Sequence, residues 1–357
     1  MWGADNKSVL LTGDEAGRTP IWQADVTSDG ISKLLEGNTN GGLSLSTDGK
    51  HLAFTRVAMH FPHEVFVANL NERTLRTRNV SKANARFLAT LDMPEPESVT
   101  VKGAGGTPMQ MWILKPPGFD PKKKWPVAYL VHGGPQGAWE DSWSFRWCPQ
   151  MWAARGYVVA LPNPRGSTGF GQKYVDEISG DWGGKCYQDL MKGVDYVEAL
   201  PYVDKERIGT AGASFGGYMM NWFAVNTGRF KCLITHCSVW NFESMWGTTD
   251  ELWFDEHEHG GLPWDVPGKY AEFSPHKKAK NLAKFKTPML VIHNDLDFRC
   301  PIGQGHELFT SLQRQRVPSR MVNFPDEGHW VAKPKNGAFW HKEVFAWLEK
   351  YVEPGGK

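Results

Sequence analysis

Ser214 is the residue whose surroundings point most clearly to covalent chemistry. It lies at the centre of Gly212-Ala213-Ser214-Phe215-Gly216, a GxSxG pattern. The apolar residues 207–211 before it predict a strand, and residues 217–225 after it predict a helix. A tight turn between a strand and a helix exposes a serine hydroxyl, and it needs small residues around it. We therefore expect Ser214 to be a nucleophile.

A serine hydroxyl needs a nearby base, and the base needs an acid that orients it. In chains with this kind of turn, the partners follow in the order Ser, Asp, His. His329 lies in a glycine-containing loop after a strand expected at 320–324, and Asp295 and Asp297 both follow a strand expected at 289–293. We expect His329 to be the general base. Spacing alone leaves Asp295 and Asp297 as alternatives for the acid.

The negative charge that develops on a substrate carbonyl needs two backbone N–H donors. The N–H of Phe215, directly after the nucleophile, is one candidate. The second is expected in the loop His132-Gly133-Gly134-Pro135, which follows an apolar strand at 127–131. Glycine there lets the backbone approach substrate closely. We interpret His132 as an anchor of this loop rather than as a catalytic group.

The string Asp255-Glu256-His257-Glu258-His259 contains metal-ligating side chains. Alternating residues on a loop before two glycines seldom close a metal site, and no second ligand group has a recognisable spacing. The sequence also has no glycine-rich phosphate loop with its lysine. We therefore expect neither a metal nor a cofactor.

Composition limits the class of protein. The chain has 357 residues, of which 41% are hydrophobic and 22% charged, as in a globular protein of two unequal domains. A net charge of +1 from dispersed residues argues against nucleic-acid partners, and no apolar run is long enough to span a membrane. The 5 cysteines form no CxxC pair and the N-terminus lacks the pattern of a signal peptide. We expect a cytoplasmic protein without a membrane partner.

Two regions follow different patterns. Residues 1–90 contain short strands and turns such as Ser28-Asp29-Gly30, and residues 43–69 are typical of one β-propeller blade. From residue 98 onward, apolar strands alternate with amphipathic helices such as 187–200. That alternation predicts a mostly parallel sheet covered on both faces. We expect partial propeller blades at 1–90 and an α/β-hydrolase catalytic domain at 98–357.

Several motifs, in order along the chain, resemble those of the prolyl oligopeptidase family. They are HGGPQG (132–137), NPRGSTGFGQ (163–172), GDWGGKCYQDLMKGVDY (180–196), GASFGGYM (212–219), DxRxP (297–301) and PDEGHW (325–330). The resemblance runs through residues 98–353 and falls on the acylaminoacyl-peptidase and dipeptidyl-peptidase V branch. It implies an α/β-hydrolase domain that follows a β-propeller. It also implies that the acid is Asp297, the one in DxRxP.

The resemblance implies further site residues. Gly134 would pair with Phe215 in the oxyanion hole. Trp240 and Phe242 resemble positions that line the pocket for the residue before the scissile bond. Arg299 resembles a position near the substrate backbone.

We expect a serine hydrolase that cleaves peptide or carboxylic ester bonds through an acyl-enzyme and prefers hydrophobic acyl groups. Its partners would be small peptides or esters. One alternative is a carboxylesterase with little peptidase activity, because most of a complete propeller is missing. The other is a non-catalytic interaction module. Partial blades expose strand edges, which favours a homo-oligomer.

Overall fold

The computed structural model describes residues 1–355, which form two compact units. The first unit comprises Met1–Pro96 with Ala138–Gln150 and Thr168–Gly171, and the second comprises the rest. The two short segments of the first unit lie within the range that the sequence assigned to the hydrolase domain. No helix within residues 1–355 is both long and apolar enough to cross a membrane.

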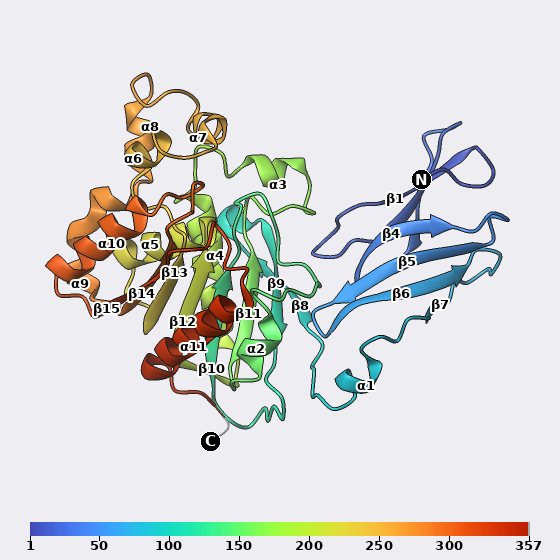
Figure 1. Cartoon of the computed structure of the whole chain (residues 1–357), viewed down its shortest axis with the longest axis horizontal. Coiled ribbons are helices and arrows are strands. Elements are labelled where there is room, and N and C mark those ends of the chain that lie inside the picture. Colours follow the sequence, from blue (N-terminus) through green and yellow to red (C-terminus); the bar gives the residue numbers. More distant parts are fainter. Residues whose placement is uncertain (356–357) are drawn as a thin grey trace. The chain divides into compact units, whose positions relative to one another are not determined.

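The first unit holds two antiparallel sheets (Figure 1). One has the order β1-β2-β3 and the other the order β4-β5-β6-β7. Their elements, with one short helix, are β1 (Ser8–Thr12), β2 (Ile21–Asp25), β3 (Ile31–Leu35), β4 (Thr39–Leu45), β5 (His51–Ala58), β6 (Phe61–Asn69), β7 (Thr77–Asn79) and α1 (Ala85–Leu88). The prediction of an all-β, antiparallel N-terminal region is confirmed. A propeller blade is a four-stranded antiparallel sheet, so the second sheet supports the blade interpretation, which stays a prediction.

The second unit is built on one 8-stranded sheet in the order β15-β14-β13-β12-β10-β11-β9-β8. Pairs from β15 through β11 are parallel, and β9 pairs antiparallel with both β11 and β8. The strands are β8 (Glu97–Lys102), β9 (Pro108–Leu114), β10 (Trp125–Val131), β11 (Val158–Asn163), β12 (Val203–Ala213), β13 (Cys232–His236), β14 (Met289–Asn294) and β15 (Ser319–Phe324). The predicted α/β fold with a mostly parallel sheet is confirmed.

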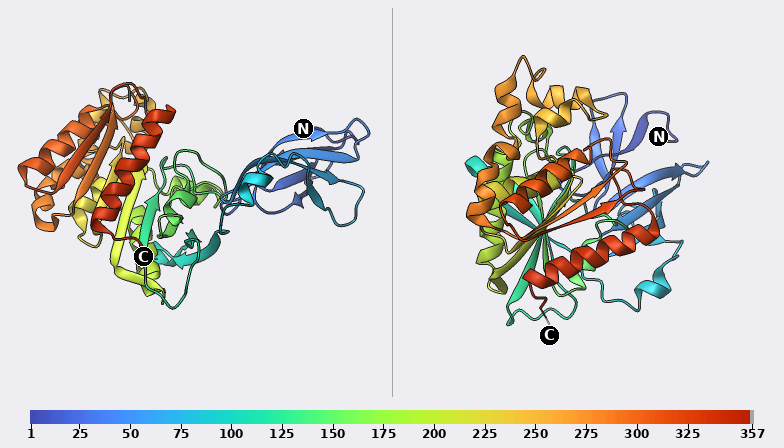
Figure 2. Two further views of the ribbon diagram at one scale, coloured as in Figure 1. Left: turned by 60° about the horizontal axis from the view of Figure 1, so that its bottom comes forward. Right: turned by 60° about the vertical axis from the view of Figure 1, so that its left-hand side comes forward.

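Helices cover both faces of this sheet (Figure 2). In β12 a Cβ on Gly209 would meet Leu348 of α11, whereas the hydroxyl of the next residue, Thr210, reaches Met220 of α5. Successive residues of a strand point to opposite faces, so α5 and α11 lie on opposite sides. The helical segments are α2 (Pro149–Ala153), α3 (Gln172–Asp176), α4 (Lys185–Ala199), α5 (Phe215–Asn226), α6 (Phe242–Trp246), α7 (Leu252–His259), α8 (Pro267–Glu272), α9 (Leu282–Phe285), α10 (Gly303–Arg314), α11 (Pro334–Tyr351) and the 3-10 turns η1 (Ala104–Gly106) and η2 (Pro275–Asn281).

The prediction of a loop at 255–259 is wrong, because these residues form the C-terminal part of α7. Gly260, in the left-handed conformation with φ of 78°, ends the helix as a C-terminal cap. The buried residues of α7 are Asp255, Glu258 and His259. A helix that buries polar side chains has no apolar stripe, so its sequence does not show the usual helical period.

Candidate active site

Ser214 lies at the sharp turn between β12 and α5. Its φ of 58° and ψ of −121° are outside the regions that a non-glycine residue ordinarily adopts. The turn is held from both sides, since the Ser214 N–H donates to the His236 carbonyl at 2.9 Å and the Tyr218 N–H donates to the Ser214 carbonyl at 2.8 Å. Backbone strain of this kind persists only where the surrounding structure enforces it.

Glycines make this turn possible because the backbone passes very close to its neighbours. A Cβ on Gly216 would lie 2.2 Å from the Val131 carbonyl oxygen. A Cβ on Gly133 would lie 3.4 Å from the Cβ of Ser214. The loop after β10 therefore runs directly beside the candidate nucleophile.

Asp297 and His329 form a close pair beyond the ends of β14 and β15. The Nδ1 atom of His329 lies 3.0 Å from Oδ1 and 2.9 Å from Oδ2 of Asp297. Because Nδ1–H donates to the carboxylate, Nε2 keeps a lone pair that can accept a proton. Within residues 1–355 no hydrogen bond joins Ser214 to His329, and such bonds often tighten only when substrate binds.

The environment of Asp297 keeps this carboxyl group ionised. Burial acts to raise its pKa, but the hydrogen bond and charge of His329 and the bonds from Cys237 and from the Cys300 N–H outweigh it, so the pKa lies below its ordinary value. Asp295, by contrast, is exposed and accepts a hydrogen bond from Asn323. Of the two acids that the sequence left open, the structure brings only Asp297 to His329.

Two buried polar side chains hold the loops of this pair. Asn294 donates from Nδ2 to the Gly328 carbonyl at 2.6 Å, which links the loop of the acid to the loop of the histidine. The carboxylate of Glu327 accepts the N–H groups of Ala332 and Lys333. Glu327 lies within the PDEGHW motif, but its role as a loop anchor depends on contacts that the motif does not reveal.

The candidate oxyanion loop is anchored by His132. The Nε2 atom of His132 lies 2.9 Å from the Ser167 hydroxyl and Nδ1 lies 2.7 Å from the Gly133 carbonyl. Burial lowers the pKa of His132 to about 4, so the ring is neutral. Gly134 adopts φ of 130°, and a Cβ there would lie 2.6 Å from the Gln136 nitrogen. Only glycine fits this position without strain.

A cavity of about 260 Å³ opens beside Ser214. Its wall includes both candidate oxyanion-hole residues and a set of apolar and aromatic side chains. The lining residues are Gly134, Gln136, Trp182, Ser214, Phe215, Val239, Met245, Thr249, Glu251, Trp253, Phe254, Arg299 and Cys300. Pockets of this kind, apolar with a few polar groups, suit hydrophobic substrate groups.

Trp240 and Phe242 are not among the lining residues, which differs from the sequence expectation. Their exposed fractions are 1% and 0%. Phe242 packs edge-on against Trp182 at 5.2 Å between ring centroids. Trp182, which does line the cavity, thus separates Phe242 from it, and the two predicted residues belong to the core behind the wall.

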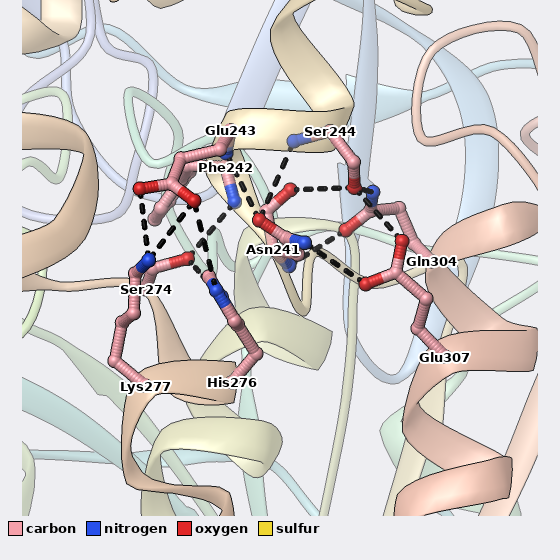
Figure 3. Close-up of polar contacts among 9 residues, drawn as sticks. All are labelled: Asn241, Phe242, Glu243, Ser244, Ser274, His276, Lys277, Gln304 and Glu307. Atoms are coloured by element: carbon pink, nitrogen blue, oxygen red, sulfur yellow. Dashed lines mark hydrogen bonds and ion pairs between the residues drawn. The ribbon is translucent and has the colours of Figure 1, made fainter. Parts of the chain in front are cut away.

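A polar network around Asn241 and Ser244 (Figure 3) fixes part of the segment 239–246. This segment supplies Val239 and Met245 to the cavity wall. The side-chain oxygen of Gln304 accepts the N–H groups of Trp240 and Asn241 at 2.9 and 2.8 Å. The hydroxyl of Ser274 accepts the Phe242 N–H at 3.0 Å. These bonds fix the backbone at Trp240 and Phe242, whose side chains are buried in the core.

Arg299 lies in the cavity wall, but its guanidinium already has acidic partners. Its Nε lies 2.8 Å from Asp250 and its Nη1 lies 2.9 Å from Glu251. Burial acts to lower the pKa of Arg299, and these two acids more than offset it. The contact of Arg299 with the substrate backbone stays a prediction, and in it the guanidinium would also be paired with these two acids.

One buried group has the composition of a metal site. The ligand atoms of Cys237, His293 and Asp297 lie within 4.8 Å of one another. Asp297 is already bound to His329, and the Cys237 thiol donates to it. His293 Nε2 lies 2.6 Å from the Cys300 carbonyl. Cys237 and His329 thus hold the Asp297 carboxylate in place, and His293 holds the loop that follows it.

The turn after β12 and the acid–base pair after β14 and β15 all lie at the carboxyl ends of parallel strands, and this arrangement defines an α/β-hydrolase. A family model described as the prolyl oligopeptidase family matches residues 143–355, more than half of the chain. The chain belongs to this family.

Curated relatives match over most of the chain. A protein of Aspergillus clavatus named "Probable dipeptidyl-peptidase 5" is 40% identical over 358 residues, which cover 98% of this chain and 49% of that protein. "Dipeptidyl-peptidase 5" of Arthroderma benhamiae is 48% identical over 258 residues, which cover 71% of this chain and 35% of that protein. The chain thus spans at most about half the length of these relatives.

Solved structures share the fold. The acylaminoacyl peptidase of Pyrococcus horikoshii matches with a TM-score of 0.87 and 24% identity, over 99% of this chain and 55% of that chain. An acylaminoacyl peptidase in complex with Z-Gly-Gly-Phe-chloromethyl ketone matches with a TM-score of 0.85 and 25% identity, over the same shares of the two chains.

Proposed function

We propose that this chain carries the catalytic machinery of a serine peptidase, with Ser214 as nucleophile, His329 as general base and Asp297 as the orienting acid. The observation that carries the proposal is the strained turn at Ser214 together with the His329–Asp297 pair. Family membership and the names of the relatives support peptide bonds as the substrate class.

In the proposed reaction, His329 Nε2 takes the hydroxyl proton as the Ser214 oxygen attacks the substrate carbonyl carbon. The carbonyl oxygen becomes negative and accepts the N–H groups of Gly134 and Phe215. Collapse of this intermediate breaks the acyl bond, and the leaving amine takes the proton from His329. A water molecule, deprotonated by His329, then releases the acid and restores Ser214.

The cavity supports a preference for hydrophobic groups at the position before the scissile bond. Trp182, Met245 and Phe254 contribute apolar surface to it. One solved relative holds an inhibitor whose reactive residue is phenylalanine, and a similar side chain is the expected occupant here. Truncation of Trp182 should therefore change the ranking of acyl groups more than truncation of Trp240.

The experiment that tests the function pairs a fluorophosphonate probe with a panel of substrates. The probe should label the wild type and not Ser214→Ala. The panel contains dipeptidyl anilides, their N-acetylated forms and acyl esters of matched side chains. Cleavage of the anilides supports a peptidase. Hydrolysis of esters alone would instead support the carboxylesterase alternative, because esters have better leaving groups, and no cleavage by a folded protein would contradict the proposal.

We also propose self-association through the N-terminal sheets. Their outer strands are β1 and β3 in one sheet and β4 and β7 in the other. Ile31, in β3, is 60% exposed, and an exposed apolar edge strand favours pairing with a second chain. Size-exclusion chromatography with light scattering should detect an oligomer that Ile31→Lys weakens, whereas a monomer at micromolar concentration would contradict it.

The compartment proposed is the cytoplasm. Cys186, Cys232, Cys237 and Cys300 are buried and in the thiol form, as is common in a reducing environment. Fractionation of the native cells should place the protein with cytoplasmic markers.

A further inference from the structure

We infer that Glu258 is a positioning residue of the active site, because its carboxylate ties the candidate oxyanion loop to the aromatic wall of the acyl pocket. The inference rests on the proposed function. It gives Glu258 no contact with the reacting atoms; Glu258 acts through Gln136 and Trp182.

Three donors from two separate segments converge on this carboxylate. Its Oε1 accepts the side-chain N–H of Gln136 and the hydroxyl of Ser179, both at 2.9 Å. Its Oε2 accepts the indole N–H of Trp182 at 2.6 Å. Gln136 and Trp182 both line the cavity beside Ser214.

Gln136 and Trp182 each lie next to one of the two proposed oxyanion donors. Gln136 follows Gly134 by two positions in the loop that supplies one oxyanion donor. Trp182 packs edge-on against Phe215 at 5.0 Å, and the N–H of Phe215 is the other proposed donor. The same ring lies 6.2 Å from Phe254 in the pocket wall. A movement of Glu258 would therefore change both the oxyanion geometry and the shape of the pocket.

The surroundings of Glu258 make its bonds hard to replace. The residue is 1% exposed, and the three donors to its carboxylate are all neutral groups. A space of only about 10 Å³ adjoins Glu258 and Trp182, which is the size of a single water molecule. Breaking one of these bonds leaves a buried polar group without bulk water to satisfy it.

Glu258→Gln is the direct test because it keeps the size of the side chain and removes one acceptor. The amide oxygen must face the indole N–H of Trp182, which can only donate, so the NH2 group faces Gln136 and Ser179, whose amide and hydroxyl must turn to accept instead of donate. We expect kcat/KM to fall by about 10–100-fold, mainly through kcat, since a misplacement of about 1 Å in an active site has an effect of this size. The ranking of alanine and phenylalanine before the scissile bond should change as well. Glu206→Gln, at a side chain that is 71% exposed, is the matched control.

A double-mutant cycle separates positioning from general destabilisation. In Trp182→Phe the donor to Oε2 is gone, so the amide of Glu258→Gln can turn its NH2 group toward the phenyl ring and keep its oxygen for Gln136 and Ser179. Glu258→Gln should then cost less than about 3-fold in the Trp182→Phe background. An equal cost in both backgrounds would overturn the inference.

Other outcomes also decide the matter. A folded Glu258→Gln with unchanged kcat, KM and substrate ranking would overturn the role of Glu258. If that variant does not fold, Gln136→Ala provides the readout, and an unchanged kcat in this variant would overturn the inference. A folded wild type that neither reacts with the fluorophosphonate nor cleaves any substrate refutes the proposed function itself, which is a distinguishable result.

Discussion

The strands of the two units bury their side chains in different ways. All residues of β10, at the centre of the second unit, are buried, whereas β6 of the first unit mixes buried, half-buried and exposed positions. A parallel strand with helices on both faces is shielded from water on both sides, and an antiparallel sheet can leave one face in solvent. Every candidate site residue lies in the second unit. Doubly covered strands thus provide the rigid ends on which a strained serine and a buried acid–base pair are held.

The largest expected effect is on turnover, because all the proposed catalytic residues lie in the second unit. Ser214→Ala should lower turnover by about 10⁴–10⁶-fold, because it removes the nucleophile and leaves only binding and oxyanion stabilisation. The free energy of unfolding should change little, since position 214 keeps its strained backbone conformation in both proteins. Fluorophosphonate labelling and thermal unfolding, measured on the same samples, check both statements. Labelling that persists in folded Ser214→Ala would remove this residue from the mechanism.

The next effect concerns the acid. Asp297→Asn keeps the shape of the side chain but turns an NH2 group toward the His329 Nδ1 atom or the backbone donors. The favoured imidazole tautomer is then lost, and kcat should fall by about 10⁴-fold. Asp295→Asn, at the exposed neighbour, is the control and should retain most of the activity. The reverse ranking of the two variants would reassign the acid.

Two buried acids, Asp255 in the second unit and Glu64 in the first, have pKa values shifted in opposite directions. Asp255 is 0% exposed, and both of its oxygens lack a hydrogen-bond partner. Burial, with smaller contributions from Glu258 and Glu251, raises its pKa to about 7. In the first unit, burial also acts to raise the pKa of Glu64, but bonds from Ser81, Asn84 and Ala83 lower it below its ordinary value.

The two acids should therefore affect stability with opposite signs. The contribution of Asp255 is fully present below its unfolded pKa near 4 and is lost as the pH rises to about 7, by a few kcal/mol. That of Glu64 is present above its unfolded pKa and is lost as the pH falls through its lower folded value. Urea unfolding of Asp255→Asn and Glu64→Gln between pH 3 and 8 tests this. Asp255→Asn should flatten the loss of stability between about pH 4 and 7, and Glu64→Gln should flatten the loss at the acidic end. Parallel curves for wild type and variant would contradict either statement.

The smallest expected effect compares one substitution in two strands. Val127→Thr in β10 places a hydroxyl at a position that is 0% exposed, and it should cost about 1–3 kcal/mol. Val65→Thr in β6, where valine is 39% exposed, should cost less than about 0.5 kcal/mol. Chemical denaturation of both variants provides the measurement. Equal costs would mean that the two sheets are covered to the same degree.

Local patterns predicted the parts of the site that depend on local structure. The turn at Ser214 follows from a strand, small residues and a helix that are contiguous in sequence, and the strand expected at 320–324 agrees with β15 to within one residue. The choice between Asp295 and Asp297 was different. Both residues follow β14 within three positions, so spacing did not separate them. The resemblance of the DxRxP motif pointed to Asp297, and the fold brings the carboxylate of Asp297 to His329.

The pocket and α7 could not be predicted in the same way. The backbone at Trp240 is held by the bond that its N–H donates to Gln304, which is distant in sequence. Glu258 was part of a string interpreted as a loop, because a helix that buries acids has no hydrophobic period. Propensity and pattern describe neighbours along the chain, and these contacts join segments that are far apart.

The long connection between β13 and β14 has a consequence for how such a protein can diversify. This stretch, 237–288, carries α6 to α9 and supplies six of the residues around the cavity, from Val239 to Phe254. None of the proposed nucleophile, base or acid lies on it. Substitutions at these cavity-lining residues can therefore change substrate preference while Ser214, His329 and Asp297 stay in place, and related hydrolases can differ in specificity through this one connection.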